Sequence, residues 1–282
     1  MIIHRVINNN FAVILDDTGN EKVVMGKGIC FGKKAGASIP EDVIEKTFIL
    51  ENEEIRERFK TILEEVSQEC VEIADHIIKK ADASLNKKLN DNIYVSLTDH
   101  IQFAINRYHQ GLQMKNELLW HIKALYPNEF KLGMETVDLI EKKCGIRLLE
   151  DECSFIALHL VAAQMNEDLP STMNITKIIK DIMSIISKYF HIRLDEESID
   201  YYRFVTHLKF FAQRLLEKRY YNDSQGAEDP LFTAVKTSYP DSFDCAQRIG
   251  QYIETIQKNT ITNEELLYLT IHIQRIIFKN KT

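Results

Sequence analysis

Cysteine is scarce in this chain, and the few cysteines are scattered. Only five occur in 282 residues, at positions 30, 70, 144, 153 and 245. None belongs to a C-x-x-C pair of the kind that binds zinc, and their spacing gives no even framework for disulfides. The sequence therefore argues against a disulfide-stapled secreted domain or a zinc ribbon, and we expect a reduced, cytoplasmic setting.

Long hydrophobic runs are also missing. No stretch approaches the roughly 20 apolar residues that a membrane-spanning helix needs. The start, Met1 to Arg5, lacks the apolar region and cleavage site of a signal peptide. With 45% hydrophobic and 27% charged residues, the composition is that of an ordinary globular protein without stable membrane insertion.

A short pattern occurs twice, 107 residues apart. Residues 99–107 read DHIQFAINR, and residues 206–214 read THLKFFAQR. Seven residues is close to two helical turns, so a histidine and an arginine at this spacing share one helix face. The two pairs are His100 with Arg107 and His207 with Arg214. An imidazole beside a fixed cation can accept and then hold a dianionic group.

The duplication extends well beyond this pattern. Residues 125–130 (LYPNEF) return as 238–243 (SYPDSF), and residues 152–159 (ECSFIALH) return as 265–272 (ELLYLTIH), both 113 positions later. His159 and His272 therefore form a second equivalent pair. Copies of about a hundred residues are domains rather than units of a repeat array. The extra residues of the second copy are expected in a polar surface loop at 222–230.

The first fifty residues have the texture of a β module. Short runs rich in β-branched or aromatic residues alternate with turns of Asn, Asp and Gly, which predicts strands at 5–7, 11–15, 22–25 and 46–50. We expect a small antiparallel β domain at 1–56. A domain of this size buries too little apolar surface to be stable alone, so we expect it to form a homodimer.

From residue 51 onward the apolar residues recur at helical spacing, as in 53–66. The expected fold is therefore multi-domain, with the β domain followed by two homologous all-α helical-bundle domains at 64–169 and 171–282. We expect a proline-containing polar linker at 166–174 between the two helical copies.

Three interpretations of the duplicated histidines compete. A lone histidine on an apolar helix is usually a packed or surface residue, but core packing gives no reason to keep His100 with Arg107 through a duplication. A metal site is disfavoured because a nearby arginine repels a bound metal cation, and no His-Glu-x-x-His pattern is present. We therefore expect neither a metal nor catalytic residues.

Reversible phosphorylation is the third interpretation. A neutral imidazole nitrogen attacks a phosphoryl donor, and the product carries close to two negative charges. Arg107, Arg214 or Arg275 could pair with that charge, whereas His159 has no arginine nearby in the sequence. Such a change at a helix contact makes a switch.

The β module carries residues that suit RNA. Asn and Gly in its loops are explained by hairpin turns alone. Amides, a lysine between two glycines and an exposed aromatic are also typical of surfaces that bind unpaired bases. The candidates are Arg5, Asn8, Asn10, Gly26, Lys27, Gly28 and Phe31. Residues 1–40 hold five basic and three acidic residues in a chain of net charge −7, so a polyanion would meet this end.

Four segments then resemble a known family. The segments VINNN (6–10), VMGKGI (24–29), FGKK (31–34) and IEKTF (44–48) are similar to the co-antiterminator RNA-binding domain of bacterial sugar-operon antiterminators, the β-glucoside/sucrose (BglG/SacY) family. The two helical halves resemble that family's two phosphotransferase-system regulation domains. His100 and His159 fall in the first, and His207 and His272 in the second.

The resemblance implies a mechanism. A dimer of the β module binds an imperfect hairpin in a leader mRNA, the ribonucleic antiterminator, and prevents formation of the overlapping terminator. The sugar-specific enzyme II component phosphorylates the first regulation domain and silences the protein when its sugar is absent. The phosphocarrier protein HPr phosphorylates the second domain and activates it.

Two alternatives remain open at this point. One is a DNA-binding operon activator with the same regulation domains, although the first fifty residues show no helix-turn-helix pattern. The other is a helical metal-dependent hydrolase, which would require bound metal.

Overall fold

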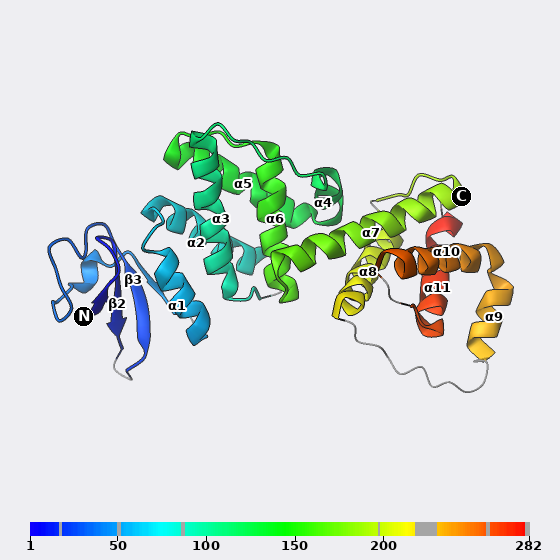
Figure 1. Ribbon diagram of the computed structural model, residues 1–282, viewed down its shortest axis with the longest axis horizontal. Coiled ribbons are helices and arrows are strands. Elements are labelled where there is room, and N and C mark those ends of the chain that lie inside the picture. The colour runs from blue at the N-terminus through cyan, green and yellow to red at the C-terminus, as the bar shows by residue number, and fades with distance from the viewer. Residues whose placement is uncertain are drawn as a thin grey trace. The chain divides into compact units, whose positions relative to one another are not determined.

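The structure is a computed structural model that describes residues 1–16, 19–49, 52–85, 88–196, 198–217, 230–257 and 260–279. The chain forms two units, residues 1–169 and 170–282, and each is described by itself (Figure 1). The expected polar loop at 222–230 lies outside the described residues except for Pro230.

The predicted β module is present at the start of the first unit. Its four strands form an antiparallel sheet in the order β1-β2-β3-β4. The strands are β1 (Ile3–Val6), β2 (Phe11–Leu15), β3 (Glu21–Met25) and β4 (Lys46–Phe48), with a short 3₁₀ turn, η1 (Glu41–Val43), before β4. Each lies within two residues of a predicted strand, because alternating β-branched residues and Asn/Gly turns define them locally.

Both faces of this sheet are buried. Side chains from β2, β3 and β4 on one face pack against Phe59 of α1 (Glu53–Ile62), against Leu63, and against Val71 and Val95 of the helices beyond. On the other face, Ile29, Cys30 and Ile39 of the long β3–β4 connection cover Ala12, Ile14 and Val24. The sheet thus gains apolar burial from the helices of its own unit.

Buried ion pairs reinforce this contact between sheet and helices. Lys60 Nζ of α1 lies 2.6 Å from Glu21 Oε2 of β3, and Lys46 Nζ of β4 lies 2.5 Å from Asp75 Oδ2. Lys60 and Asp75 are almost fully buried. Each buried charge has a second partner on its own helix, Glu57 for Lys60 and Lys79 for Asp75. These small charge networks therefore link the β module to the helices.

The first helical module follows within the same unit. It consists of α2 (Gln68–Ser84), α3 (Asn92–His109), α4 (Leu119–Leu125), α5 (Pro127–Cys144) and α6 (Glu150–Met165). Residues 152–163 of α6 are all buried, since α3, α4 and α5 pack around this helix (Figure 1). Pro127 begins α5 and left-handed Gly145 ends it, as capping preferences lead one to expect.

The second unit contains the second helical module. Its helices are α7 (Leu169–Phe190), α8 (Ile199–Glu217), α9 (Pro230–Ser238), α10 (Pro240–Gln257) and α11 (Asn263–Lys279). They follow the same order as α2 to α6, so the expectation of two homologous helical bundles is confirmed (Figure 1). Among the described residues, no helix combines the length and apolar character needed to cross a bilayer.

The predicted linker at 166–174 is wrong in extent. Helix α7 already begins at Leu169, and only residues 166–168 lie outside helices. Pro170 is tolerated because the first turn of a helix has no partner for its N–H. Thr172 is buried, and its carbonyl accepts a hydrogen bond from the Thr176 hydroxyl at 2.8 Å. Proline and polar residues therefore mark a helix start here.

Two glycines in equivalent helices should respond oppositely to alanine. A Cβ on Gly133 of α5 would lie 2.2 Å from the Cys153 carbonyl oxygen, so Gly133→Ala should destabilise the first unit by about 1–3 kcal/mol. A Cβ on Gly250 of α10 would meet the flexible tip of Ile261 at 2.9 Å, so Gly250→Ala should be neutral or stabilising. Urea unfolding of the full chain measures both; equal losses would contradict this packing difference.

Candidate functional site: two histidine pairs and a loop platform

Each helical module brings two histidines into contact across two helices. The ring centroids of His100 on α3 and His159 on α6 are 4.8 Å apart, with an interplanar angle of 46°. Those of His207 on α8 and His272 on α11 are also 4.8 Å apart, at 45°. The sequence showed that these histidines are duplicated, but only the fold shows that each module holds its own pair in the same geometry.

A glutamate joins the first pair to its arginine. His100 Nε2 lies 3.1 Å from Glu152 Oε2, and Arg107 donates a hydrogen bond to Glu152 Oε1 at 2.7 Å. The expected shared face of His100 and Arg107 is thus confirmed, because one carboxylate reaches both side chains. Burial alone would raise the pKa of Glu152, but the hydrogen bonds and charges of His100 and Arg107 outweigh it and lower that pKa.

His159 is the buried member of the first pair. Its Nε2 has no hydrogen-bond partner among the described residues. Burial, assisted by the adjacent His100, lowers the pKa of His159 well below its usual value. The ring is therefore a neutral imidazole, which is the form that can act as a nucleophile.

The second pair has the same geometry but different surroundings. Glu265 Oε2 accepts a hydrogen bond from the Thr262 backbone N–H at 3.0 Å, and the Glu265 N–H donates to Thr262 Oγ1 at 3.2 Å. This is a capping box at the start of α11. Arg214 Nη2 remains 3.7 Å from the other carboxylate oxygen. His207 is exposed, and a cavity of about 280 Å³ lies beside it.

Tyr268 packs against both histidines of the second module. Its ring centroid is 5.2 Å from that of His207 and 4.4 Å from that of His272. The hydroxyl is buried without a hydrogen-bond partner among the described residues, and burial raises its pKa to about 12 despite the Arg214 charge. Phe155 occupies the corresponding position of the first module, so only the second has a hydroxyl here.

His272 resembles His159 in its protonation. Burial, together with the charges of His207 and Arg275, lowers the pKa of His272 to about 4, with Asp200 opposing the shift. Arg275 is exposed on the same helix. Its charge acts on His272, whereas its predicted pairing with a phosphoryl group stays a prediction.

Sequence reasoning did not select Glu152, Glu265 or Tyr268 as site residues. The signal was available for the glutamates, since each precedes the second histidine of its module by seven positions and therefore shares its helix face. The spacing of Thr262 and Glu265 is also the sequence signature of a capping box, which sequence reasoning missed. Nothing in the sequence alone, however, indicates that Glu152 contacts His100.

The loops of the β module form one platform. The Gly28 N–H donates to Asn10 Oδ1 at 2.8 Å, and the Gly26 N–H donates to the Asn10 carbonyl at 3.0 Å. The Cys30 N–H donates to the Asn9 carbonyl at 3.0 Å. These bonds place the turn at 8–10 beside the loop at 26–31, so candidates from both loops share one surface.

Three of the predicted RNA-binding residues are available on this platform. Phe31 is 77% exposed, and Lys27 and Gly28 are exposed beside it. Gly28 has a left-handed φ of 66°, which favours glycine at the turn. Exposed Asn9, which we had not selected, lies on the same turn.

Three other predicted RNA-binding residues make contacts within the protein that explain their residue type without RNA. The Asn8 side chain accepts from the Asn10 and Phe11 N–H groups at 2.8 and 3.1 Å and donates to the Leu63 carbonyl at 2.6 Å. Arg5 donates to Glu64 at 3.1 Å. A Cβ on Gly26 would lie 2.3 Å from the Val43 carbonyl oxygen.

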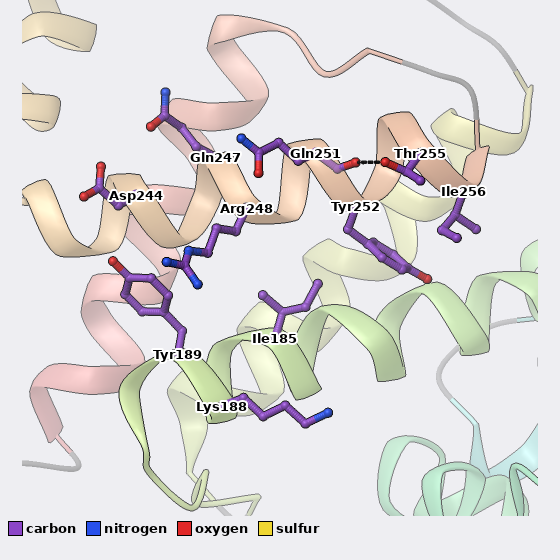
Figure 2. A pocket seen from close by; sticks show the side chains of 10 residues that line it. All are labelled: Ile185, Lys188, Tyr189, Asp244, Gln247, Arg248, Gln251, Tyr252, Thr255 and Ile256. Carbon is purple, nitrogen blue, oxygen red and sulfur yellow. Dashed lines mark hydrogen bonds between the residues drawn. The ribbon is translucent and has the colours of Figure 1, made fainter.

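A separate groove of about 900 Å³ lies between α7 and α10 (Figure 2). Arg248 stacks over the Tyr189 ring at 4.8 Å there, and the Tyr252 hydroxyl donates to Asp181 at 2.5 Å. None of the four paired histidines lines this groove. Among the described residues, no cluster of three metal-ligating side chains is present.

Comparisons with known proteins agree with this architecture. Residues 1–57 match the CAT RNA binding domain, and residues 75–163 and 180–276 each match the PRD domain. The chain belongs to the family of transcription antiterminators that join a CAT RNA-binding domain to PRD domains. The match at 1–57 is to an RNA-binding domain, which leaves the DNA-binding activator without support.

Individual relatives are similar over nearly their whole length. The transcription antiterminator LicT of Bacillus subtilis (strain 168) is 48% identical over 277 residues, which cover 98% of this chain and 99% of LicT. The β-glucoside operon antiterminator of Dickeya chrysanthemi is 41% identical, covering 98% and 96%. The crystal structure of GlcT CAT-PRDI has a TM-score of 0.51 at 39% identity and covers 58% of this chain and 98% of that one. The names of these relatives describe regulators rather than enzymes.

Protonation of the second pair gives a measurable prediction. Because burial lowers the pKa of His272 in the folded chain, the unfolded chain binds the proton first as the pH falls. Folding stability should therefore decrease between about pH 6.5 and about pH 4. NMR titration of ring-labelled histidine in the full chain should find His272 neutral at pH 5.5; a midpoint near pH 6.5 would contradict the buried environment.

Proposed function

We propose that this protein is a cytoplasmic transcription antiterminator of a sugar-utilisation operon. Its β domain, residues 1–56, binds a leader-mRNA hairpin as a homodimer and prevents terminator formation. Two regulation domains, residues 64–169 and 171–282, receive phosphoryl groups from the phosphotransferase system. The sugar-specific enzyme II component inhibits through the first, and HPr activates through the second.

The loop platform supports the RNA-binding part of the proposal. Phe31 offers an exposed ring on which an unpaired base can stack, and Lys27 supplies a cation for the backbone. The hydrogen bonds between the two loops hold these groups on one surface before RNA arrives. Arg5 and Asn8 contribute to the platform through their contacts with residues 63 and 64, and Gly26 and Asn10 through the loop geometry.

The histidine pairs support the phosphorylation part. The observation that carries it is that two modules place paired imidazoles 4.8 Å apart beside an arginine, in the same geometry twice. In the transfer, the N–P bond of the donor phosphohistidine breaks and a new N–P bond forms to an imidazole nitrogen, while the ring proton passes to the donor. His100, His159, His207 and His272 are the proposed acceptors.

Arginines would hold the product charge. Arg107 and Arg214 lie on the helices of His100 and His207, and Arg275 lies on the helix of His272. A phosphohistidine carries close to two negative charges, so charge-assisted hydrogen bonds from guanidinium groups stabilise it. A new dianion within a helix contact alters how neighbouring elements pack, which gives the regulatory response.

The RNA-binding surface can be tested with Phe31→Ala in the full chain. Loss of one base-stacking contact of about 1–3 kcal/mol should weaken binding to a bulged leader hairpin about five- to 150-fold. Phe278→Ala, at another exposed ring in the second module, is the control and should bind as the unsubstituted chain does. Equal affinity for a fully paired duplex would argue against loop recognition.

The phosphoryl-binding role of Arg214 has its own test. Incubation with phosphoenolpyruvate, enzyme I and HPr should add acid-labile phosphate at His207 or His272, measured by peptide mass spectrometry. Arg214→Gln should lower that phosphate content about tenfold or more, because it removes a charge-assisted contact of about 1.5–3 kcal/mol. Exposed Arg203→Gln on the same helix is the matched control. Unchanged labelling in Arg214→Gln would contradict the role.

A further inference from the structure

The two modules differ at the position that precedes the last helix. Leu149 is the N-cap residue of α6, and its side chain cannot cap the helix. Thr262 stands at the corresponding position before α11 and caps it through its hydroxyl. The third residue of each helix is a glutamate, Glu152 or Glu265. Both helices therefore carry a glutamate at their third position, but only the second has a hydroxyl at the N-cap.

This difference changes what the glutamate does. In the second module the Glu265 carboxylate returns to the Thr262 N–H at 3.0 Å and makes no hydrogen bond to His207 within the described residues. In the first module Glu152 reaches His100 at 3.1 Å and Arg107 at 2.7 Å instead. The Glu152 carboxylate thus occupies the space between imidazole and guanidinium that a phosphoryl group on His100 would need.

The space around the two histidines differs accordingly. The cavity of about 280 Å³ beside His207 is lined by Arg214, Thr262 and Tyr268. The small hollow beside Glu152 has about 20 Å³, and His100 does not line it. The His100 side chain is only 11% exposed, whereas His207 is exposed.

We propose that the N-cap residue of the last helix sets how readily each module accepts a phosphoryl group. In the first module, Leu149 leaves Glu152 free to act as an internal counter-anion that obstructs His100. In the second, Thr262 draws Glu265 into a capping box and leaves His207 open. Leu149, Thr262 and the two glutamates are positioning residues, and this inference rests on the proposed phosphorylation of the histidines.

The test uses the full chain and phosphoramidate, a small donor that needs no protein docking. Its N–P bond breaks, a new N–P bond forms to the imidazole, and the ring proton leaves with the ammonia. Peptide mass spectrometry gives the labelling rate of each histidine separately. We expect His207 to be labelled faster than His100 in the unsubstituted chain.

Leu149→Thr should create the missing capping box and draw Glu152 away from His100. Labelling of His100 should then rise about fivefold, the factor that an N-cap of about 1 kcal/mol supplies. Leu149→Val is the matched control, because valine has the shape of threonine without its hydroxyl. Leu149 is 37% exposed, so both substitutions are tolerated at this position.

Thr262→Val is the reciprocal change. It should release Glu265 toward Arg214 and His207 and slow the labelling of His207, whereas Thr262→Ser should retain the fast rate. Glu152→Gln, which removes the anion directly, should accelerate His100.

The outcomes separate this inference from the proposed function. Equal His100 rates in Leu149→Thr and Leu149→Val, with His207 labelled normally, would overturn the inference alone. An unchanged His207 rate in Thr262→Val would do the same. Labelling of none of the four histidines, by phosphoramidate or by HPr, would overturn the proposed function together with the inference.

Discussion

A carboxylate can satisfy only a few partners at once, and the arrangement of both histidine pairs depends on this constraint. Glu152 and Glu265 stand at the same helix position, close to an imidazole, an arginine and the N-terminus of their helix. Where the N-cap side chain has no oxygen, the carboxylate bridges His100 and Arg107. Where it is threonine, the carboxylate returns to the backbone, and the histidine stays exposed.

Polar side chains of the β module also have their partners within the protein, in or beside the helices of the same unit. Asn8 and Arg5 are predicted to bind RNA, yet their side chains bond residues 63 and 64 just after α1. Lys60 and Lys46 are held by acidic residues across the boundary between sheet and helices. Polar groups therefore connect the loops that present Phe31 and Lys27 to the first helical module.

The two helical modules share one arrangement of helices but differ in the side chains around their histidines. The imidazole pairs have the same spacing and angle, since the helices that carry them pack alike. The modules differ at two corresponding positions. Leu149 of the first corresponds to Thr262 of the second, which changes the capping of the last helix. Phe155 corresponds to Tyr268, which changes the polarity around the histidine rings. The two modules therefore present different chemical surroundings to their paired histidines.

The sequence by itself determined the strands, most helices, the duplication, the family and the four histidines. Alternation, helical spacing and repeated motifs are local patterns that survive without tertiary information. Tertiary structure decided that the histidines form pairs, that Pro170 lies inside α7, and that Glu152 and Glu265 have different partners. The partners of the two glutamates depend on which groups reach each carboxylate in three dimensions, and His100 and Glu152 are 52 positions apart in the chain. The histidine pairs likewise join helices that are distant in the sequence.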